Sequence, residues 1–165
     1  MYSTADVKVA NATSRGAGAV GAKAIVPRMV LEIARPEDTI LDFGSGTTAQ
    51  HAQMLRARGL DVTAYDFGEN VRPGVHDTRA LSRTYTLVYA SNVLNVLSSR
   101  TMLRITIREL FDACTWDGSV VCNYPQSPRK ADLRPSEIEA ELCEVFSSVT
   151  RVAGTSSTPV WVCMP

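Results

Sequence analysis

Short apolar runs separated by amphipathic stretches predict a chain of alternating strands and helices. Six runs rich in aliphatic and aromatic residues, each bounded by polar or turn residues, have the length of β-strands. These runs are residues 39–43, 61–66, 84–90, 119–123, 147–153 and 160–164. We expect one further, very short strand within residues 71–76.

Apolar residues spaced three and four positions apart predict the helices that connect these strands. The predicted helices are residues 17–34, 47–58, 100–114 and 135–145, with a single helical turn at residues 79–83. Pro27 is expected to kink or divide the first helix, because proline lacks a backbone donor. Thr47 or Thr48 can cap the second helix, which Gly59 ends. Pro135 occupies the favoured first position of the last helix.

The alternation indicates an α/β fold class, a Rossmann-like, doubly wound and mostly parallel sheet with helices on both faces. The last two strands are joined by small polar residues at 154–159, so we expect a C-terminal antiparallel hairpin. Residues 1–16 are expected to be a mobile N-terminal arm, and residues 17–165 a single domain.

Composition narrows the classes of partner. The 165 residues include 17 Lys and Arg and 17 Asp and Glu, so the formal net charge is zero. A neutral chain argues against a protein-wide attraction to nucleic acid, although a local basic patch stays open. The four cysteines form no C-x-x-C pair, and no histidine lies at ligand spacing from them, so we expect no metal site.

The sequence also bears on location. No apolar run reaches the ~18 residues of a membrane span, and residues 1–12 lack the apolar core of a signal peptide. We interpret the four cysteines as reduced thiols. These observations predict a soluble, cytoplasmic protein that does not bind membranes.

The chemistry begins at Gly44-Ser45-Gly46, between a predicted strand and a predicted helix. Two glycines let the backbone turn sharply and approach a ligand, and the free N–H groups of a helix N-terminus favour a carboxylate or phosphate. Asp66 ends the next strand, where a carboxylate can accept both hydroxyls of a ribose. The sequence therefore predicts a nucleoside-containing ligand at this edge of the sheet.

Two cofactor classes fit this loop. Residues 44–49 also satisfy the dinucleotide fingerprint G-x-G-x-x-G/A, which favours NAD. Asp42, just before the glycines, would repel a pyrophosphate but could pair with the ammonium group of S-adenosylmethionine. A dehydrogenase also needs a second nucleotide-binding half and a substrate domain, for which 165 residues are too few.

At these residues the chain resembles class I S-adenosylmethionine-dependent methyltransferases. Residues 40–46, Ile-Leu-Asp-Phe-Gly-Ser-Gly, resemble the first motif of that family, and Asp66 is similar to its acidic ribose ligand. Residues 85–97 are similar to the fourth-strand motif, and residues 116–118 to the turn before the fifth strand. The segment Ser-Asn-Val-Leu-Asn-Val within it resembles small bacterial and phage-type members of undefined substrate. The resemblance runs from about residue 17 to the C-terminus.

The resemblance implies a set of cofactor-binding residues. They are Asp42, Gly44, Ser45, Gly46, Asp66, Phe67, Asp77 and Ser91. The family usually has a clear third strand with an acid that contacts adenine, and here only His76-Asp77 can take that part.

Residues at the ends of the later strands are candidates for holding the methyl acceptor. Ser91 and Asn92 follow one strand and are the first candidates, with a capped helical turn as the alternative. Asn123-Tyr124-Pro125 follows the next strand. Its composition is similar to the Asn-Pro-Pro-Tyr motif of amino-directed methyltransferases, in a different order and after a different strand. We therefore predict Ser91, Asn92 and Tyr124 as catalytic residues. The alternative for residues 123–125 is an ordinary proline turn without a role in catalysis.

Several polar residues nearby have weaker assignments. Arg129, Lys130 and Arg134 could meet an anionic substrate or a nucleic-acid backbone, or form a solvated basic loop. His76 is a candidate general base, and His51 could flank the cofactor or lie on a helix surface. Asn95 is expected on a helix surface or polar rim. The residues that could close over the cofactor's carboxylate are Arg15 and Lys23.

The sequence thus predicts an S-adenosylmethionine-dependent methyltransferase acting on a small-molecule or compact acceptor. Two alternatives stay open: a cofactor-binding subunit completed by a partner, and an NAD-binding oxidoreductase. Nucleic acid as the acceptor has no support from the charge. Assembly as a homodimer or with a partner subunit is also open.

Overall fold

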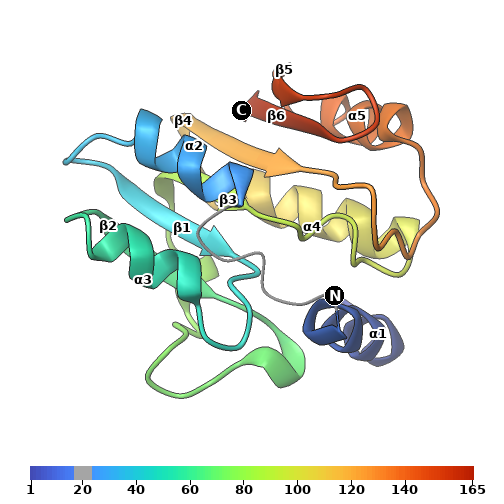
Figure 1. The fold of residues 1–165 in the computed structure, drawn as a ribbon, viewed down its shortest axis with the longest axis horizontal. Coiled ribbons are helices and arrows are strands. Elements are labelled where there is room, and N and C mark those ends of the chain that lie inside the picture. The colour runs from blue at the N-terminus through green and yellow to red at the C-terminus, as the bar shows by residue number, and fades with distance from the viewer. Residues whose placement is uncertain (17–23) are drawn as a thin grey trace.

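The computed structural model describes residues 1–16 and 24–165 and has a six-stranded sheet at its centre (Figure 1). The strand order is β2-β1-β3-β4-β6-β5. Strands β2, β1, β3 and β4 are parallel, while β6 runs antiparallel to both β4 and β5. The strands are β1 (Thr39–Phe43), β2 (Asp61–Tyr65), β3 (Tyr85–Ala90), β4 (Cys114–Asn123), β5 (Ser148–Gly154) and β6 (Pro159–Met164). The predicted fold class and the C-terminal hairpin are confirmed.

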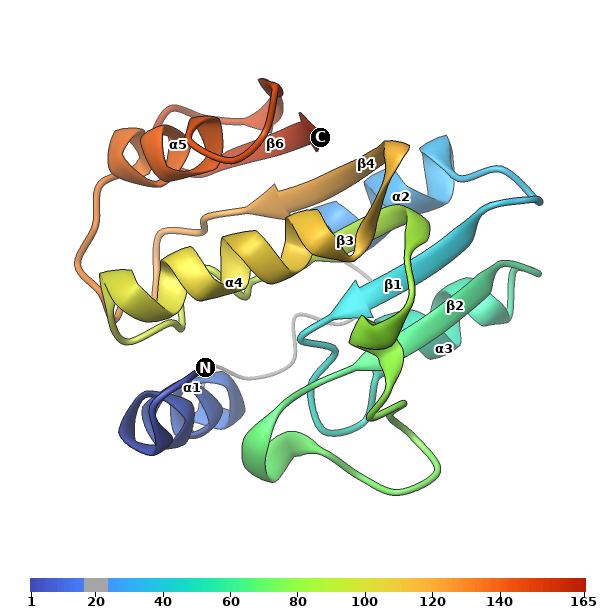
Figure 2. The same ribbon diagram turned by 180° about the vertical axis from the view of Figure 1, so that it is seen from behind.

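Helices cover both faces of this sheet, as Figures 1 and 2 show. One face packs against α2 and α3, and the other against α4 and α5. The helices are α1 (Thr4–Gly16), α2 (Ile25–Ile33), α3 (Gln50–Arg56), α4 (Arg100–Asp112) and α5 (Pro135–Cys143), with 3₁₀ turns η2 (Gly68–Asn70) and η3 (Ala80–Ser82). In the described part of the chain, no helix is long and apolar enough to cross a membrane.

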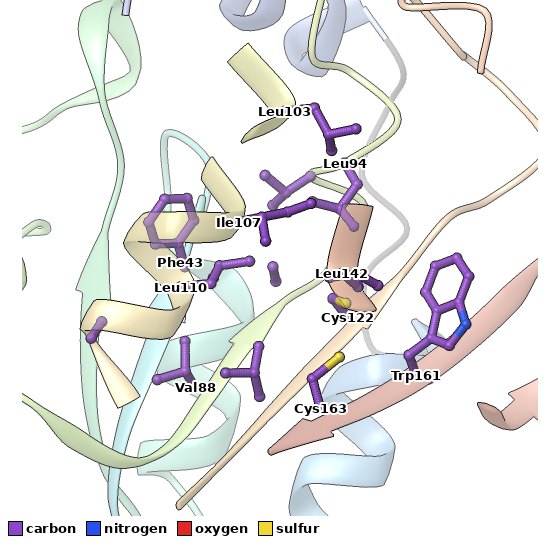
Figure 3. Close-up of a cluster of buried hydrophobic side chains, with 14 of the residues drawn as sticks. Phe43, Val88, Leu94, Leu103, Ile107, Leu110, Cys122, Leu142, Trp161 and Cys163 are labelled. Carbon is purple, nitrogen blue, oxygen red and sulfur yellow. The ribbon is translucent and has the colours of Figure 1, made fainter. Parts of the chain in front are cut away.

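The larger core lies between the sheet and α4 (Figure 3). Leu103, Ile107 and Leu110 recur along one side of α4 and are fully buried, as the spacing of the apolar residues predicts. The hydroxyl of Ser99 accepts a hydrogen bond from the Met102 N–H and caps the first turn. Trp161 of β6 closes the far side of this core beneath α5.

The N-terminal residues differ from the prediction of a mobile arm. Residues 4–16 form α1, which lies at the side of the sheet to which the β1 arrow points (Figure 1). Ala10 and Asn11 are almost completely buried against the domain. The sequence signal was weak because so few side chains of this helix are buried.

The structure bears on two helix predictions and corrects the second. Residues 17–23, the first part of the predicted helix 17–34, lie outside the described residues. Within the described residues, Pro27 lies in the first turn of α2, where its missing N–H has no helical partner to lose, and α2 continues past it to Ile33. The residue before α3 is Ala49, in left-handed conformation with φ 48°, so neither Thr47 nor Thr48 caps this helix.

Two strand predictions are also corrected. Residues 71–76 form turns instead of a third strand. The turn expected at residues 116–118 lies inside β4, as an irregularity where the pairing with β3 changes register between Tyr85 and Leu87.

The strand order places the carboxyl ends of β1, β2, β3 and β4 along one edge of the sheet. Strand β1 lies between β2 and β3, so the chain leaves β1 in one direction for β2 and later returns to its other side at β3. In open α/β sheets, such a reversal opens a crevice at the carboxyl ends of the strands. The residues that follow β1, β2, β3 and β4 therefore meet at a single edge.

Candidate active site

The glycine loop after β1 is tied to the end of β2. The N–H groups of Gly44 and Ser45 both donate to the carbonyl of Tyr65, at 2.9 and 3.0 Å. Gly44 has φ +74°, and a Cβ added there would lie 2.6 Å from Cγ2 of Val93. Both the positive φ and the close approach of Val93 therefore disfavour a side chain at this position. Gly46 also has positive φ (+71°), but the space beside it is open.

Asp66 bonds directly to this loop. Its Oδ2 accepts the Gly46 N–H at 2.7 Å, and its Oδ1 accepts the Phe67 N–H at 2.8 Å. The side-chain amide of Asn70 donates to Oδ1 at 3.3 Å. Asp66 is only 5% exposed, and burial raises its pKa against the opposing effect of these bonds. The structure thus brings Asp66 and the glycine loop together, as the strand positions predict.

Asp42 is a second carboxyl at the same edge, on the face of the sheet covered by α3. It is 1% exposed, and burial raises its pKa to about 7, although the Tyr89 hydroxyl and, to a smaller extent, the Ala52 N–H favour the charged form. Its Oδ2 has no hydrogen-bond partner among the described residues. Asp42 pairs in register with Tyr89 of β3, and burial together with the neighbouring Asp42 carboxyl raises the pKa of the Tyr89 hydroxyl.

Buried polar atoms without partners gather at this edge of the described structure. Besides Oδ2 of Asp42, they include Oγ of Ser91, just after β3, and Oδ1 of Asn70, beside Asp66. An unpaired buried polar group costs about 1–3 kcal/mol, so a cluster of them at one edge is typical of a ligand site.

The residues after β3 and β4 are joined by a reciprocal amide pair. Oδ1 of Asn123 accepts the backbone N–H of Asn92 at 2.7 Å. Nδ2 of Asn123 donates to Oδ1 of Asn92 at 2.8 Å. Asn92 has left-handed backbone conformation, with φ 57°, while Asn123 is almost fully buried. The two candidate acceptor segments therefore form one unit.

Tyr124 does not face this edge as the prediction of a catalytic role requires. Its side chain is 1% exposed within the core, and its hydroxyl donates to the Leu133 carbonyl at 2.9 Å. Arg129 covers the ring at 4.3 Å and donates to the carbonyls of Pro125, Tyr124 and Ser157. These two side chains stabilise the proline-rich loop, because the Tyr124 hydroxyl and the Arg129 guanidinium both form their hydrogen bonds to carbonyl groups within or beside it.

Asp77 is also placed differently from the predicted adenine contact. Its carboxylate accepts the Arg79 N–H at 2.8 Å and forms an ion pair with Arg83 at 2.7 Å. The bond from Arg79 is the main reason that the pKa of Asp77 is lowered. The carboxylate therefore stabilises its own turn and the start of β3, instead of facing the glycine loop.

The neighbouring His76 does reach the loop. Its Nε2 lies 2.9 Å from the carbonyl oxygen of Gly46, and its Nδ1 accepts the Arg72 N–H at 2.9 Å. This ring was expected as a candidate general base, but both of its nitrogens are engaged by backbone groups.

The remaining candidates lie around the site or away from it. Asn95 is 2% exposed, contrary to the expected surface position, and joins the loop after β3 to Pro128 and Lys130. The side chains of Lys130 and Arg134 are exposed, and Arg134 pairs with Glu137. His51 is half-buried in the first turn of α3. Lys23 and the side chain of Arg15 lie outside the described residues.

The sequence analysis missed the contribution of α1 and of Tyr2, which lies shortly before it. Tyr2 stacks on Phe67 with ring centroids 5.1 Å apart. Asn11 accepts the Glu69 N–H at 2.8 Å, and Asn70 donates to Oγ of Ser14 at 3.3 Å. These contacts join residues more than 50 positions apart, so no local pattern could have indicated them.

Two other features are alternative candidates for a functional site, and neither is as well suited as this edge of the sheet. A groove of about 560 Å³ lies between α4 and α5, but its Arg104 and Glu141 are paired with each other at 2.7 Å. No three His, Cys, Asp or Glu side chains cluster for a metal ion in residues 1–16 and 24–165.

Comparisons with known proteins identify what this arrangement is similar to. A protein family described as a methyltransferase domain matches residues 19–150. No curated protein sequence matches. A TehB-like S-adenosylmethionine-dependent methyltransferase from Corynebacterium glutamicum has a TM-score of 0.67 at 16% identity, covering 92% of this chain and 91% of its own.

Two further solved structures carry cofactor molecules. A methyltransferase from Bacteroides fragilis, solved with S-adenosyl-L-homocysteine, has a TM-score of 0.62 at 15% identity over 85% of this chain and 76% of its own. The glycopeptide N-methyltransferase MtfA, solved with S-adenosyl-L-methionine, has a TM-score of 0.63 at 13% identity over 88% and 95%. At these identities the likeness is one of fold.

Proposed function

Because the chain belongs to the methyltransferase-domain family, we propose that it transfers the methyl group of S-adenosylmethionine to an acceptor at the carboxyl edge of the sheet. The observation that carries the proposal is the meeting of a glycine loop with two buried carboxyls, Asp42 and Asp66, beside the switch point. Structural neighbours solved with this cofactor or its product support the choice of donor.

The chain's polar groups fit the donor. The unpaired Oδ2 of Asp42 suits the donor's ammonium group, directly or through water, and would disfavour a pyrophosphate. Asp66 can accept ribose hydroxyls beside the open space at Gly46. Bound there, the sulfonium cofactor would supply an activated methyl group.

At the acceptor side, Ser91, Asn92 and Asn123 supply neutral hydrogen-bonding groups. The pair formed by Asn92 and Asn123 fixes both segments, and Ser91 leaves a buried hydroxyl for a ligand. Such groups align an acceptor with the methyl carbon, and alignment is the main requirement of an in-line transfer. We propose a small-molecule or compact acceptor.

The test combines binding with transfer. Calorimetry with S-adenosylhomocysteine should show saturable binding to the wild type that is reduced at least ~10-fold in Asp66→Ala, because a charge-assisted contact is lost. Arg58→Ala, at an exposed position beyond the far end of α3, is the matched control and should bind normally. No binding to the wild type would refute the proposal.

Transfer of labelled methyl groups to nucleic acid, protein or metabolite fractions of a cell extract then identifies the acceptor class. Binding without transfer to any fraction would favour the alternative of a subunit completed by a partner. Binding of NADH in place of S-adenosylhomocysteine would favour the oxidoreductase. We also propose a cytoplasmic location, since Cys114, Cys122 and Cys163 are buried free thiols.

A further inference from the structure

The segment between β2 and β3 is anchored at His76. The Val75 and His76 N–H groups both donate to the Arg72 carbonyl at 3.1 Å, and the Arg72 N–H donates back to Nδ1 of His76. The next residue, Asp77, donates its N–H to the Ala64 carbonyl of β2 at 2.9 Å. The turn thus fixes both the backbone and the ring of His76.

These bonds determine which nitrogen carries the proton. Nδ1 accepts from an N–H group, so a neutral imidazole at this position has its hydrogen on Nε2. Nε2 lies 2.9 Å from the Gly46 carbonyl oxygen and can therefore donate to it. A general base needs a free acceptor nitrogen, and neither nitrogen of this ring is free to take that part.

The Gly46 peptide is consequently held on two sides. Asp66 accepts its N–H at 2.7 Å, and His76 donates to its carbonyl, which also accepts the Ala49 N–H at 3.2 Å. Gly46 is left-handed and borders open space, so little besides these bonds orients it. If Asp66 turns to ribose hydroxyls when the donor binds, His76 still holds the loop.

We propose that His76 is a positioning residue for the methyl donor, acting through the bond from Nε2 to the Gly46 carbonyl. This inference rests on the proposed function, because it assigns the loop to the donor. His76 does not contact the reacting atoms, so its loss weakens donor binding and raises KM for the donor more than it lowers kcat.

The test uses two substitutions at one position. His76→Leu removes the N–H group that donates to the Gly46 carbonyl. We expect ~10-fold weaker binding of S-adenosylhomocysteine by calorimetry, which is the effect of one hydrogen bond. His76→Gln keeps an N–H donor and a carbonyl acceptor and should recover most of the affinity. Arg79→Ala, an exposed position in the same segment, is the control and should bind like the wild type.

A second measurement does not depend on binding of the methyl donor. Long-range ¹H–¹⁵N spectra of the imidazole in the free wild-type protein should show the tautomer protonated at Nε2, and the Gly46 amide signal should shift in His76→Leu. The tautomer protonated at Nδ1, or wild-type affinity in His76→Leu, would overturn the assignment. Absence of binding to the wild type would instead refute the proposed function, so the two failures are distinguishable.

Discussion

Replacing Asp42 with asparagine should have two effects: it should stabilise the ligand-free protein and weaken binding of the methyl donor. Burial raises the pKa of this carboxyl from 3.8 to about 7. Between those values the folded chain keeps a proton that the unfolded chain has released, so stability falls as the pH rises through this window. A pKa higher by about 3, at about 1.4 kcal/mol for each unit, gives an upper bound of about 4 kcal/mol above pH 7.

A neutral amide at position 42 carries no such penalty. We expect urea unfolding at pH 8 to show Asp42→Asn more stable than the wild type by about 2–4 kcal/mol, with the difference small at pH 4. Taking the difference between the two proteins removes the contribution of groups that titrate in both. Asp61→Asn, at the exposed start of β2, is the matched control for loss of a carboxyl, and it should not be stabilised by this amount at pH 8.

The same substitution should weaken S-adenosylhomocysteine binding at pH 8 at least ~10-fold, because the product keeps the ammonium group that Asp42 is proposed to meet. Parallel stability curves for Asp42→Asn and the wild type would refute the argument about burial. A variant that is more stable but binds normally would refute the pairing with the ammonium.

Two further predictions concern the loop and the acceptor side. Gly44→Ala should lower the free energy of unfolding by about 1–3 kcal/mol, measured in urea, because the new Cβ meets Val93 at positive φ. Gly46→Ala has open space and should cost about 1 kcal/mol, so an equal loss would contradict the steric argument. Asn123→Ala should lower kcat at least ~10-fold while S-adenosylhomocysteine binding stays within about twofold, because its partner is Asn92 and not the glycine loop. A change confined to binding would place Asn123 with the donor.

The sequence pattern is sufficient to predict a structural element when the residues that determine that element are neighbours in the chain. Residues 39–43 are a strand because a short apolar run is bounded by a turn on each side. The approach of Asp66 to Gly46 follows from parallel topology, since adjacent strands end at the same edge. Both therefore could be predicted from sequence.

The errors arise where a side chain is used by a distant or competing partner. The Tyr124 hydroxyl bonds to a carbonyl nine positions away on a loop of irregular course. Asp77 could be placed near adenine by analogy, but Arg83 and a backbone N–H take its carboxylate. The role of α1 depends on Asn11 and Ser14 meeting residues 58 and 56 positions later, which no periodicity indicates.

The contacts of α1 extend, through one side chain, to the carboxylate proposed to hold ribose. The amide nitrogen of Asn70 donates to both Ser14 and Asp66. If Asp66 reorients toward a ligand, the bond that Asn70 shares between helix and carboxylate changes with it, so the docking of α1 and the occupancy of the site are energetically coupled. Linkage is reciprocal. If ligand binding raises the equilibrium constant for docking of α1 by some factor, undocking of α1 lowers the affinity for the ligand by the same factor. An affinity that depends on the reorientation of Asp66 would then depend also on the first sixteen residues.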